Sequence, residues 1–154
     1  VSFKTEAVAS AAHKWTFDYG RAATKSFKVE CARSDSEPLC IGVVPASRVR
    51  EIKGATNTAV PGSAFVRNDG AVCYFSSDGE AKQSVLPHEV GPVVHVVARS
   101  VRDAEVCVAF FSQGRLLCRV TAHTAEPLVP IVMSSRASAW ELRTSFGDGT
   151  GVSL

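Results

Sequence analysis

The residues that could carry chemistry are spread along this chain without a recognisable catalytic spacing. There are four histidines, far apart in the sequence: His13, His88, His95 and His123. The sequence contains no Gly-x-Ser-x-Gly nucleophile elbow, no His-Glu-x-x-His zinc motif and no phosphate-binding loop. Gly147, Gly149 and Gly151 alternate, but no predicted helix follows them to offer its N-terminus to a phosphate. The sequence therefore predicts a protein that is not an enzyme.

The cysteines also argue against a chemical site. The chain has five of them: Cys31, Cys40, Cys73, Cys107 and Cys118. Their number is odd and no two are spaced Cys-x-x-Cys, which disfavours both a disulfide framework and a zinc site. Several fall within predicted strands, where a free cysteine packs as a small hydrophobic side chain. We therefore predict no metal and no cofactor, and we expect a reducing, intracellular location in the cytoplasm or nucleus.

Length and composition indicate one globular domain. The chain has 154 residues, of which 45% are hydrophobic and 21% charged, and its formal net charge is +2. That charge is too small to make nucleic acid a favoured partner. No apolar run approaches the ~20 residues of a membrane helix, so no membrane partner is expected. We predict a single domain over residues 1–146, with an uncertain N-terminal extension over 1–13 and a flexible tail over 147–154, within a longer multidomain protein.

The elements that must position any site are predicted to be strands. Residues 93–132 read as four strands joined by turns, and the pattern is clearest around the tight turn at Gly114. Before that turn Val106, Val108 and Phe110 alternate with more exposed residue types, a period of two that places alternate side chains on opposite faces of a strand. Gly114 supplies the positive φ that a hairpin reversal needs.

The rest of the chain follows the same pattern. Further strands are predicted near residues 15–19, 27–31, 39–44, 64–66, 71–75 and 140–146. Residues 46–53 are predicted to hold a helical turn capped by Ser47, and residues 82–92 a loop with a short extended piece. Many short strands at this spacing predict an all-β fold, a two-sheet antiparallel β-sandwich with at most one or two short helices.

The order of these strands resembles the SPRY domain, a bent, concanavalin-like β-sandwich that acts as a protein-interaction module. The similar segments, with the family pattern for each, are 26–30 (Y-F-E-V), 40–44 (I-G-V), 62–74 (S-W-G-Y…G…Y), 93–97 (D-V-V-G-V), 110–115 (F-F-x-N-G) and 127–132 (L-Y-P-A-V). The six segments come in the order of the family, and the resemblance runs from about Trp15 to Leu142, which is most of the chain.

The resemblance implies a function and a site. In that family, loops at one end of the sandwich bind a peptide from a partner protein, so we expect a non-enzymatic adaptor or scaffold module with a protein or peptide partner. Two matching regions carry over as partner-binding residues, the hairpin aromatic and the loop after the last core strand: Tyr74, and Ser134, Ser135, Arg136, Ala137 and Ser138.

Two alternatives remain open from the residues themselves. Arg115 and Arg119 are predicted to share one face of a strand, and a basic strand face could bind a glycan or RNA. A hydrolase whose site is assembled from distant loops is the other alternative, because such a site leaves no local motif.

Overall fold

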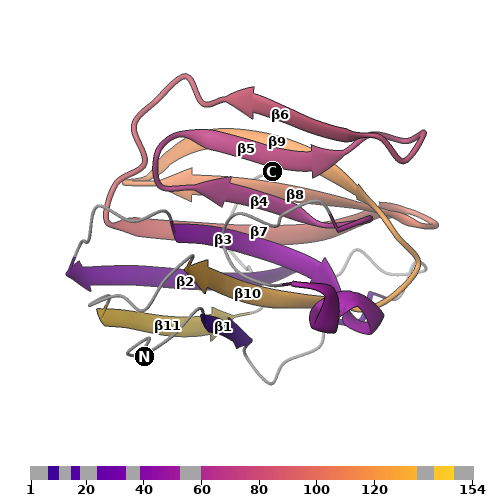
Figure 1. Ribbon diagram of the computed structural model, residues 1–154, viewed down its shortest axis with the longest axis horizontal. Helices are drawn as coiled ribbons and strands as arrows, with labels where there is room; N and C mark the ends of the chain where they lie inside the picture. The colour runs from indigo at the N-terminus through magenta and orange to yellow at the C-terminus, as the bar shows by residue number, and fades with distance from the viewer. Residues whose placement is uncertain are drawn as a thin grey trace.

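Two antiparallel β-sheets are stacked face to face in the computed structural model (Figure 1), which describes residues 7–10, 15–17, 24–33, 39–52, 60–134 and 141–147. The six-stranded sheet has the order β1 (Ala7–Ser10), β10 (Leu128–Ser134), β3 (Leu39–Pro45), β4 (Ala64–Arg67), β5 (Ala71–Phe75) and β6 (Ala81–Val85). The five-stranded sheet has the order β11 (Glu141–Gly147), β2 (Thr24–Arg33), β7 (Val93–Arg102), β8 (Glu105–Ser112) and β9 (Arg115–His123). One short 3₁₀ helix, η1 (Ala46–Glu51), completes the described elements, so the predicted sandwich is confirmed.

The main core lies between the two sheets. Strand alternation turns one face of each sheet inward, as predicted around β8, where Val106, Val108 and Phe110 are fully buried. Phe27 of β2 and Leu128 of β10 join them in the same cluster. Burial of one such side chain contributes ~1.5–3 kcal/mol relative to leaving it in water.

A second, smaller core covers the outer face of the six-stranded sheet. It contains Phe65, Ile131 and Met133, and η1 packs beside it. Gly42 makes this packing possible, because a Cβ there would lie 2.6 Å from Cδ1 of Phe65. The helix itself differs from prediction: its N-cap is Pro45, with no side-chain capping hydrogen bond, so Ser47 is not the cap.

The predicted turn between β8 and β9 is confirmed, and it contains two residues between the paired Ser112 and Arg115. Both of its central residues have positive φ, Gln113 at 54° and Gly114 at 73°. This pair of left-handed residues is typical of a type I′ turn, whose twist matches that of the flanking strands.

Two other segments differ from the sequence-based prediction. The residues expected to form a strand near 15–19 contribute an isolated bridge, Trp15 to Leu128, and residues 18–20 lie outside the described part of the chain. The short extended piece expected within residues 82–92 is present as strand β6, which begins one residue earlier. Strand β11 includes Gly147, which the sequence placed in the tail, and residues 148–154 lie outside the described residues. Among the described residues, no helix is long and apolar enough to cross a membrane.

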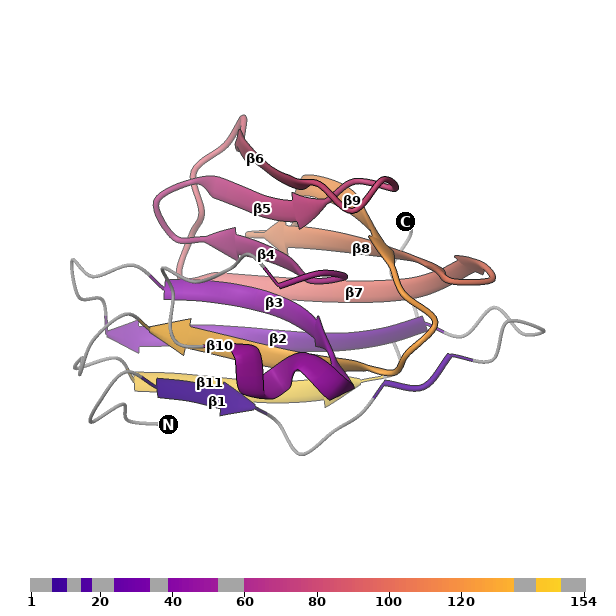
Figure 2. The ribbon, with the colours of Figure 1, turned by 45° about the vertical axis from the view of Figure 1, so that its right-hand side comes forward.

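The two sheets end unevenly at one side of the sandwich. At the other side, β1 and β11 end the two sheets together, whereas β6 is the outermost strand in both views (Figures 1 and 2). Strand β9, the edge of the five-stranded sheet, packs against β5 and β4. The six-stranded sheet therefore extends one strand, β6, beyond its partner, and all five residues of β6 are exposed.

Candidate functional site

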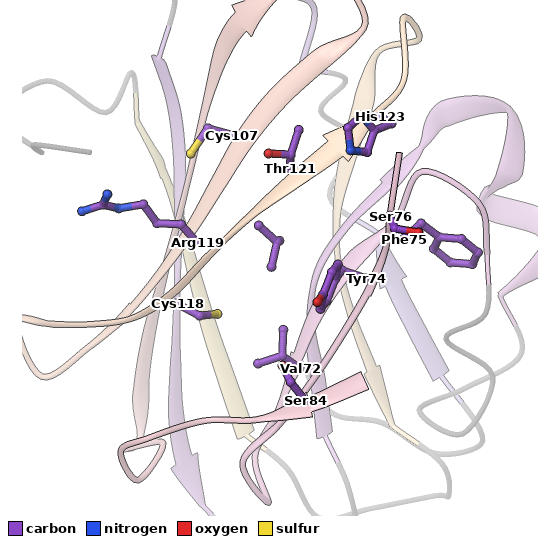
Figure 3. Close-up of a pocket in the computed structure, with 11 residues that line it drawn as sticks. Val72, Tyr74, Phe75, Ser76, Ser84, Cys107, Cys118, Arg119, Thr121 and His123 are labelled. Atoms are coloured by element: carbon purple, nitrogen blue, oxygen red, sulfur yellow. The ribbon is translucent and has the colours of Figure 1, made fainter. Parts of the chain in front are cut away.

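A groove opens on the side of the sandwich where β6 extends beyond β9. Its volume is about 390 Å³. We call it the side groove. It is lined by Val72, Tyr74, Phe75, Ser76, Ser84, Cys107, Cys118, Arg119, Val120, Thr121 and His123 (Figure 3).

One wall of the side groove comes from the inner face of the six-stranded sheet. Val72 and Tyr74 lie two residues apart on β5, so they point to the same face, and both pack against the main core. Their register partners on β6 are Ser84 and Lys82, respectively. The wall therefore combines an apolar base on β5 with a polar, exposed rim on β6.

The opposite wall comes from β9. Cys118 and Val120 pair with inward residues of β8 and pack against the main core, and the sulfur of Cys118 points toward Tyr74 (Figure 3). Arg119 and Thr121 also line the groove, although they point to the other face of the strand. Residues 118–121 are consecutive, so their side chains point alternately to the two faces of β9. A hollow that all four of them line must therefore reach both faces of the strand. The side groove therefore runs along the outer edge of β9, with which no described strand pairs.

The side groove has a positive charge at its rim, from Arg119 of β9. Arg119 is exposed and takes part in none of the ion pairs found among the described residues. None of the groove-lining residues carries a carboxylate. Lys82 lies nearby on β6 but is paired with Glu80, at 2.9 Å. The guanidinium of Arg119, which has no ion-pair partner within the described part of the chain, is thus available to an anionic group.

The two cysteines of the groove are not activated nucleophiles. Burial raises the pKa of the Cys118 thiol to about 11. Burial also raises the pKa of Cys107, with a smaller opposing effect from Arg119 and Arg99. Because the thiolate is the reactive form, both groups stay protonated near neutral pH, and Cys118 serves as an apolar contact.

The predicted basic strand face does not form. A β-bulge shifts the register of β9, so that Arg115 pairs with Ser112 while Arg119 pairs with Ala109. Ser112 and Ala109 are three residues apart on β8 and therefore face opposite ways. The prediction that Arg115 and Arg119 share a face is wrong, because the extra residue in the bulge reverses the alternation between them. Arg115 instead contacts Nδ1 of His88, at 3.2 Å.

The two predicted site residues that the structure describes, Tyr74 and Ser134, lie apart. Tyr74 lines the side groove, whereas Ser134 ends β10 and pairs with Leu39 and Ala7. Three strand spacings, about 14 Å, separate β10 from β5 across the sheet. Across the paired strands, the residue of β10 in line with Tyr74 is Pro130. Pro130 is four residues, or roughly 13 Å, along the strand from Ser134. Ser135, Arg136, Ala137 and Ser138 lie outside the described residues.

Of the residues that line the side groove, the sequence predicts a partner-binding role for Tyr74 and a place on a basic face for Arg119, and it assigns no binding role to the others. The alternation in β9 does carry a signal for Cys118 and Val120, which read as inward side chains. Nothing local marks them as lying beside a free strand edge, because that depends on which strand ends each sheet. Among the described residues, no group of three or more histidine, cysteine, aspartate or glutamate side chains is placed to hold a metal ion.

Comparison with known proteins identifies the fold. A human SPRY domain matches with a TM-score of 0.62 and 15% sequence identity, over 92% of this chain and 84% of that one. Sheep galectin-11, in a complex with glycerol, matches with a TM-score of 0.46 and 12% identity, over 94% and 100%. An alginate lyase matches with a TM-score of 0.42 and 10% identity, over 94% and 76%.

No family model and no curated protein sequence matches this chain. The structural likeness is nevertheless extensive, because the SPRY-domain match includes nearly all of the chain. The low identity means that the likeness concerns the backbone arrangement. The chain thus has the β-sandwich fold of the SPRY domain, with a divergent sequence.

Proposed function

We propose that this chain is a non-enzymatic protein-interaction module that binds an extended segment of a partner polypeptide in the side groove. It would act as an adaptor or scaffold part of a larger intracellular protein. The observation that carries the proposal is the side groove itself, an open channel along the edge of β9 with Tyr74 among its apolar side chains and Arg119 at its rim.

The shape of the groove favours a chain-like ligand. Its volume of about 390 Å³ falls within the range of small-molecule sites, but such sites usually enclose most of their ligand. The side groove is instead open along the free edge of β9 and bordered by the exposed strand β6. An extended peptide can lie along such a channel and place single side chains into it.

The residue types favour binding to a protein. Tyrosine and arginine are common among the residues that contribute most to protein interfaces, because each offers a large contact area and a polar end. Tyr74 is partly exposed in the groove, with its ring against the main core. The ring is therefore held in place before a partner arrives, which lowers the entropic cost of binding.

The SPRY-type fold supports the same class of function, since the family resemblance in the sequence implies a peptide partner. The loop that includes Arg136 remains a predicted second contact region. It lies outside the described residues, so the proposal depends on the side groove alone.

The proposal is tested by selecting ligands from a random peptide library displayed on phage. Binding of the selected peptides is then measured by fluorescence anisotropy with the wild type, with Tyr74→Ala and with Phe111→Ala. Phe111 is a partly buried aromatic residue of β8 that does not line the groove. We expect Tyr74→Ala to weaken binding by about tenfold or more, as for a residue central to an interface.

The matched control separates the groove from general effects on stability. Phe111→Ala should leave peptide affinity within about twofold of the wild type, and circular dichroism should show that both variants are folded. Peptides that bind the wild type and Tyr74→Ala equally well would place the interaction elsewhere and overturn the proposal. In that case Arg136→Asp tests the loop.

A further inference from the structure

We infer that the partner segment binds by strand addition: it lies beside β9 as a sixth strand of the five-stranded sheet and carries alternating apolar and acidic side chains. This inference rests on the proposed function and specifies both the binding mode and the chemistry of the partner. The experiments below distinguish a failure of strand addition from a failure of the proposed function.

The fold provides a place for one more strand. The six-stranded sheet extends beyond the five-stranded sheet by β6, so no described strand lies opposite β6 (Figures 1 and 2). Ser84 of β6 lines the side groove. All five residues of β6 are exposed on both faces, as expected for a strand with no opposite layer. A strand added beside β9 would lie opposite β6 and would give the five-stranded sheet a sixth strand.

The edge of β9 is suited to pairing. The strand is nine residues long, and alternate backbone N–H and C=O groups on its free side point away from β8. The side groove is lined by residues from both faces of β9, so the hollow is centred on this edge. Extended peptides commonly bind to exposed sheet edges in this way, with backbone hydrogen bonds contributing the affinity.

The inward side chains of an added strand would meet an apolar surface. Val72 and Tyr74 from β5 face Cys118 from β9 across the groove (Figure 3). Val120 of β9 also lines the groove and packs against the main core. Because the pKa of Cys118 is raised by burial, its thiol adds no charge to this surface near neutral pH. Valine or leucine at every second position of the peptide would fill the space between the two walls.

The outward side chains would lie beside Arg119. This guanidinium projects away from the groove interior (Figure 3), on the face where the other half of the peptide side chains would point. It has no carboxylate partner among the described ion pairs, and the groove lining contributes no carboxylate. Opposite charges on neighbouring strands stabilise pairing, so acidic residues are favoured at the outward positions.

The same charge argues against a second copy of this chain as the occupant. Arg119 is the middle residue of β9, so an antiparallel pair of β9 strands related by a two-fold axis there would place Arg119 opposite its own copy. Arg115 would then lie opposite His123 of the other copy. Like charges directly opposite one another destabilise strand pairing, so β9 is protected from pairing with itself.

The first test compares synthetic peptides by fluorescence anisotropy. The probe is a labelled nonapeptide of alternating valine and glutamate. One control has the same composition in pairs, Val-Val-Glu-Glu, which cannot sort its side chains onto two faces, and another has lysine in place of glutamate. We expect the alternating valine–glutamate peptide to bind at least about tenfold more tightly than either control.

Protein variants test the role of the charge. Arg119→Glu should reverse the preference between the glutamate and lysine peptides. Arg99→Glu is the matched control, because Arg99 is also an exposed arginine of this sheet but lies on β7, two strands from the edge. It should leave the preference unchanged. Since Arg119 is exposed, thermal melting should show both variants to be folded.

Backbone methylation distinguishes strand addition from simple groove binding. In a bound strand, one alternate set of peptide N–H groups faces β9 and the other set faces solvent. N-methylation of one set, either the valines or the glutamates, should abolish binding, and methylation of the other set should leave it. Equal tolerance of both sets would overturn strand addition, as would equal binding of the paired-composition control or no saturable binding up to about 1 mM.

The two proposals fail in different ways. If library peptides lose affinity in Tyr74→Ala but tolerate methylation of either set, the groove binds partners without strand addition. If Tyr74→Ala has no effect on any peptide, the groove is not the binding site and both proposals are wrong.

Discussion

The thiols of this protein provide a sensitive test of the groove geometry. Cys118 lines the side groove with a pKa raised from 9.0 to about 11, and Cys40, on the outer face of the six-stranded sheet, has a pKa of about 12. Burial is the main cause of the raised pKa in both residues. The perturbation is alkylation by N-ethylmaleimide at about pH 8, which reacts with the thiolate.

The expected rates follow from these pKa values. A rise of about two units lowers the thiolate fraction of Cys118 about 100-fold, but a more basic thiolate is also about six- to tenfold more nucleophilic. Cys118 should therefore react about tenfold more slowly in the folded protein than in urea. The same reasoning gives Cys40 a rate about 30- to 60-fold slower, before the complete burial of its side chain is considered.

The assay is a labelling time course in which each cysteine peptide is quantified by mass spectrometry, with the protein in urea as the reference. Cys107 should react before Cys118, because Arg119 and Arg99 oppose the rise in its pKa, and Cys118 should react before the buried Cys40. Saturation with the alternating valine–glutamate peptide should slow Cys118 further and leave Cys40 unchanged. Alkylation of Cys40 in the folded protein as fast as in urea would refute the burial on which these rates depend.

Two further predictions concern stability. Gly42→Ala should lower the free energy of unfolding by about 3 kcal/mol in urea titrations, because the added methyl group meets the Ala64 carbonyl and Phe65. Gly79→Asn, in an open turn, is the control and should lower it by less than about 1 kcal/mol. Equal effects of the two substitutions would contradict the packing at Gly42. The raised pKa of Cys40 keeps its proton bound in the folded chain after the unfolded chain has lost it, so stability should fall from about pH 9 towards pH 12. Cys40→Ala should reduce this slope by up to about 1.4 kcal/mol per pH unit in urea titrations across that range, and an unchanged slope would show that the thiol is not buried as described.

Much of the fold could be predicted from the sequence because β-structure leaves a local signature. The alternation through Val106, Val108 and Phe110 places those side chains on one face, and the structure buries all three. The turn at Gly114 was also predictable, since few residues tolerate positive φ there. Such features depend on neighbours within a few residues, which is the range over which sequence patterns act.

The site could be predicted only in part. The family resemblance named Tyr74 as partner-binding, and Tyr74 lines the side groove, but Ser134, expected at the same site, ends a strand on the other side of the sheet. The pattern of one strand cannot show how many strands lie between two segments. The bulge in β9 was also not predictable from the alternation of that strand, and its one extra residue turned Arg115 and Arg119 to opposite faces.

The sequence by itself determined that this chain forms strands, which side chains those strands bury, and where the hairpins reverse. The tertiary structure decided which strands end each sheet, and therefore that β6 extends beyond β9 and leaves the side groove beside Tyr74 and Arg119. The physical reason is that alternation and turn geometry are local properties of the backbone. A free sheet edge exists only once distant segments have paired.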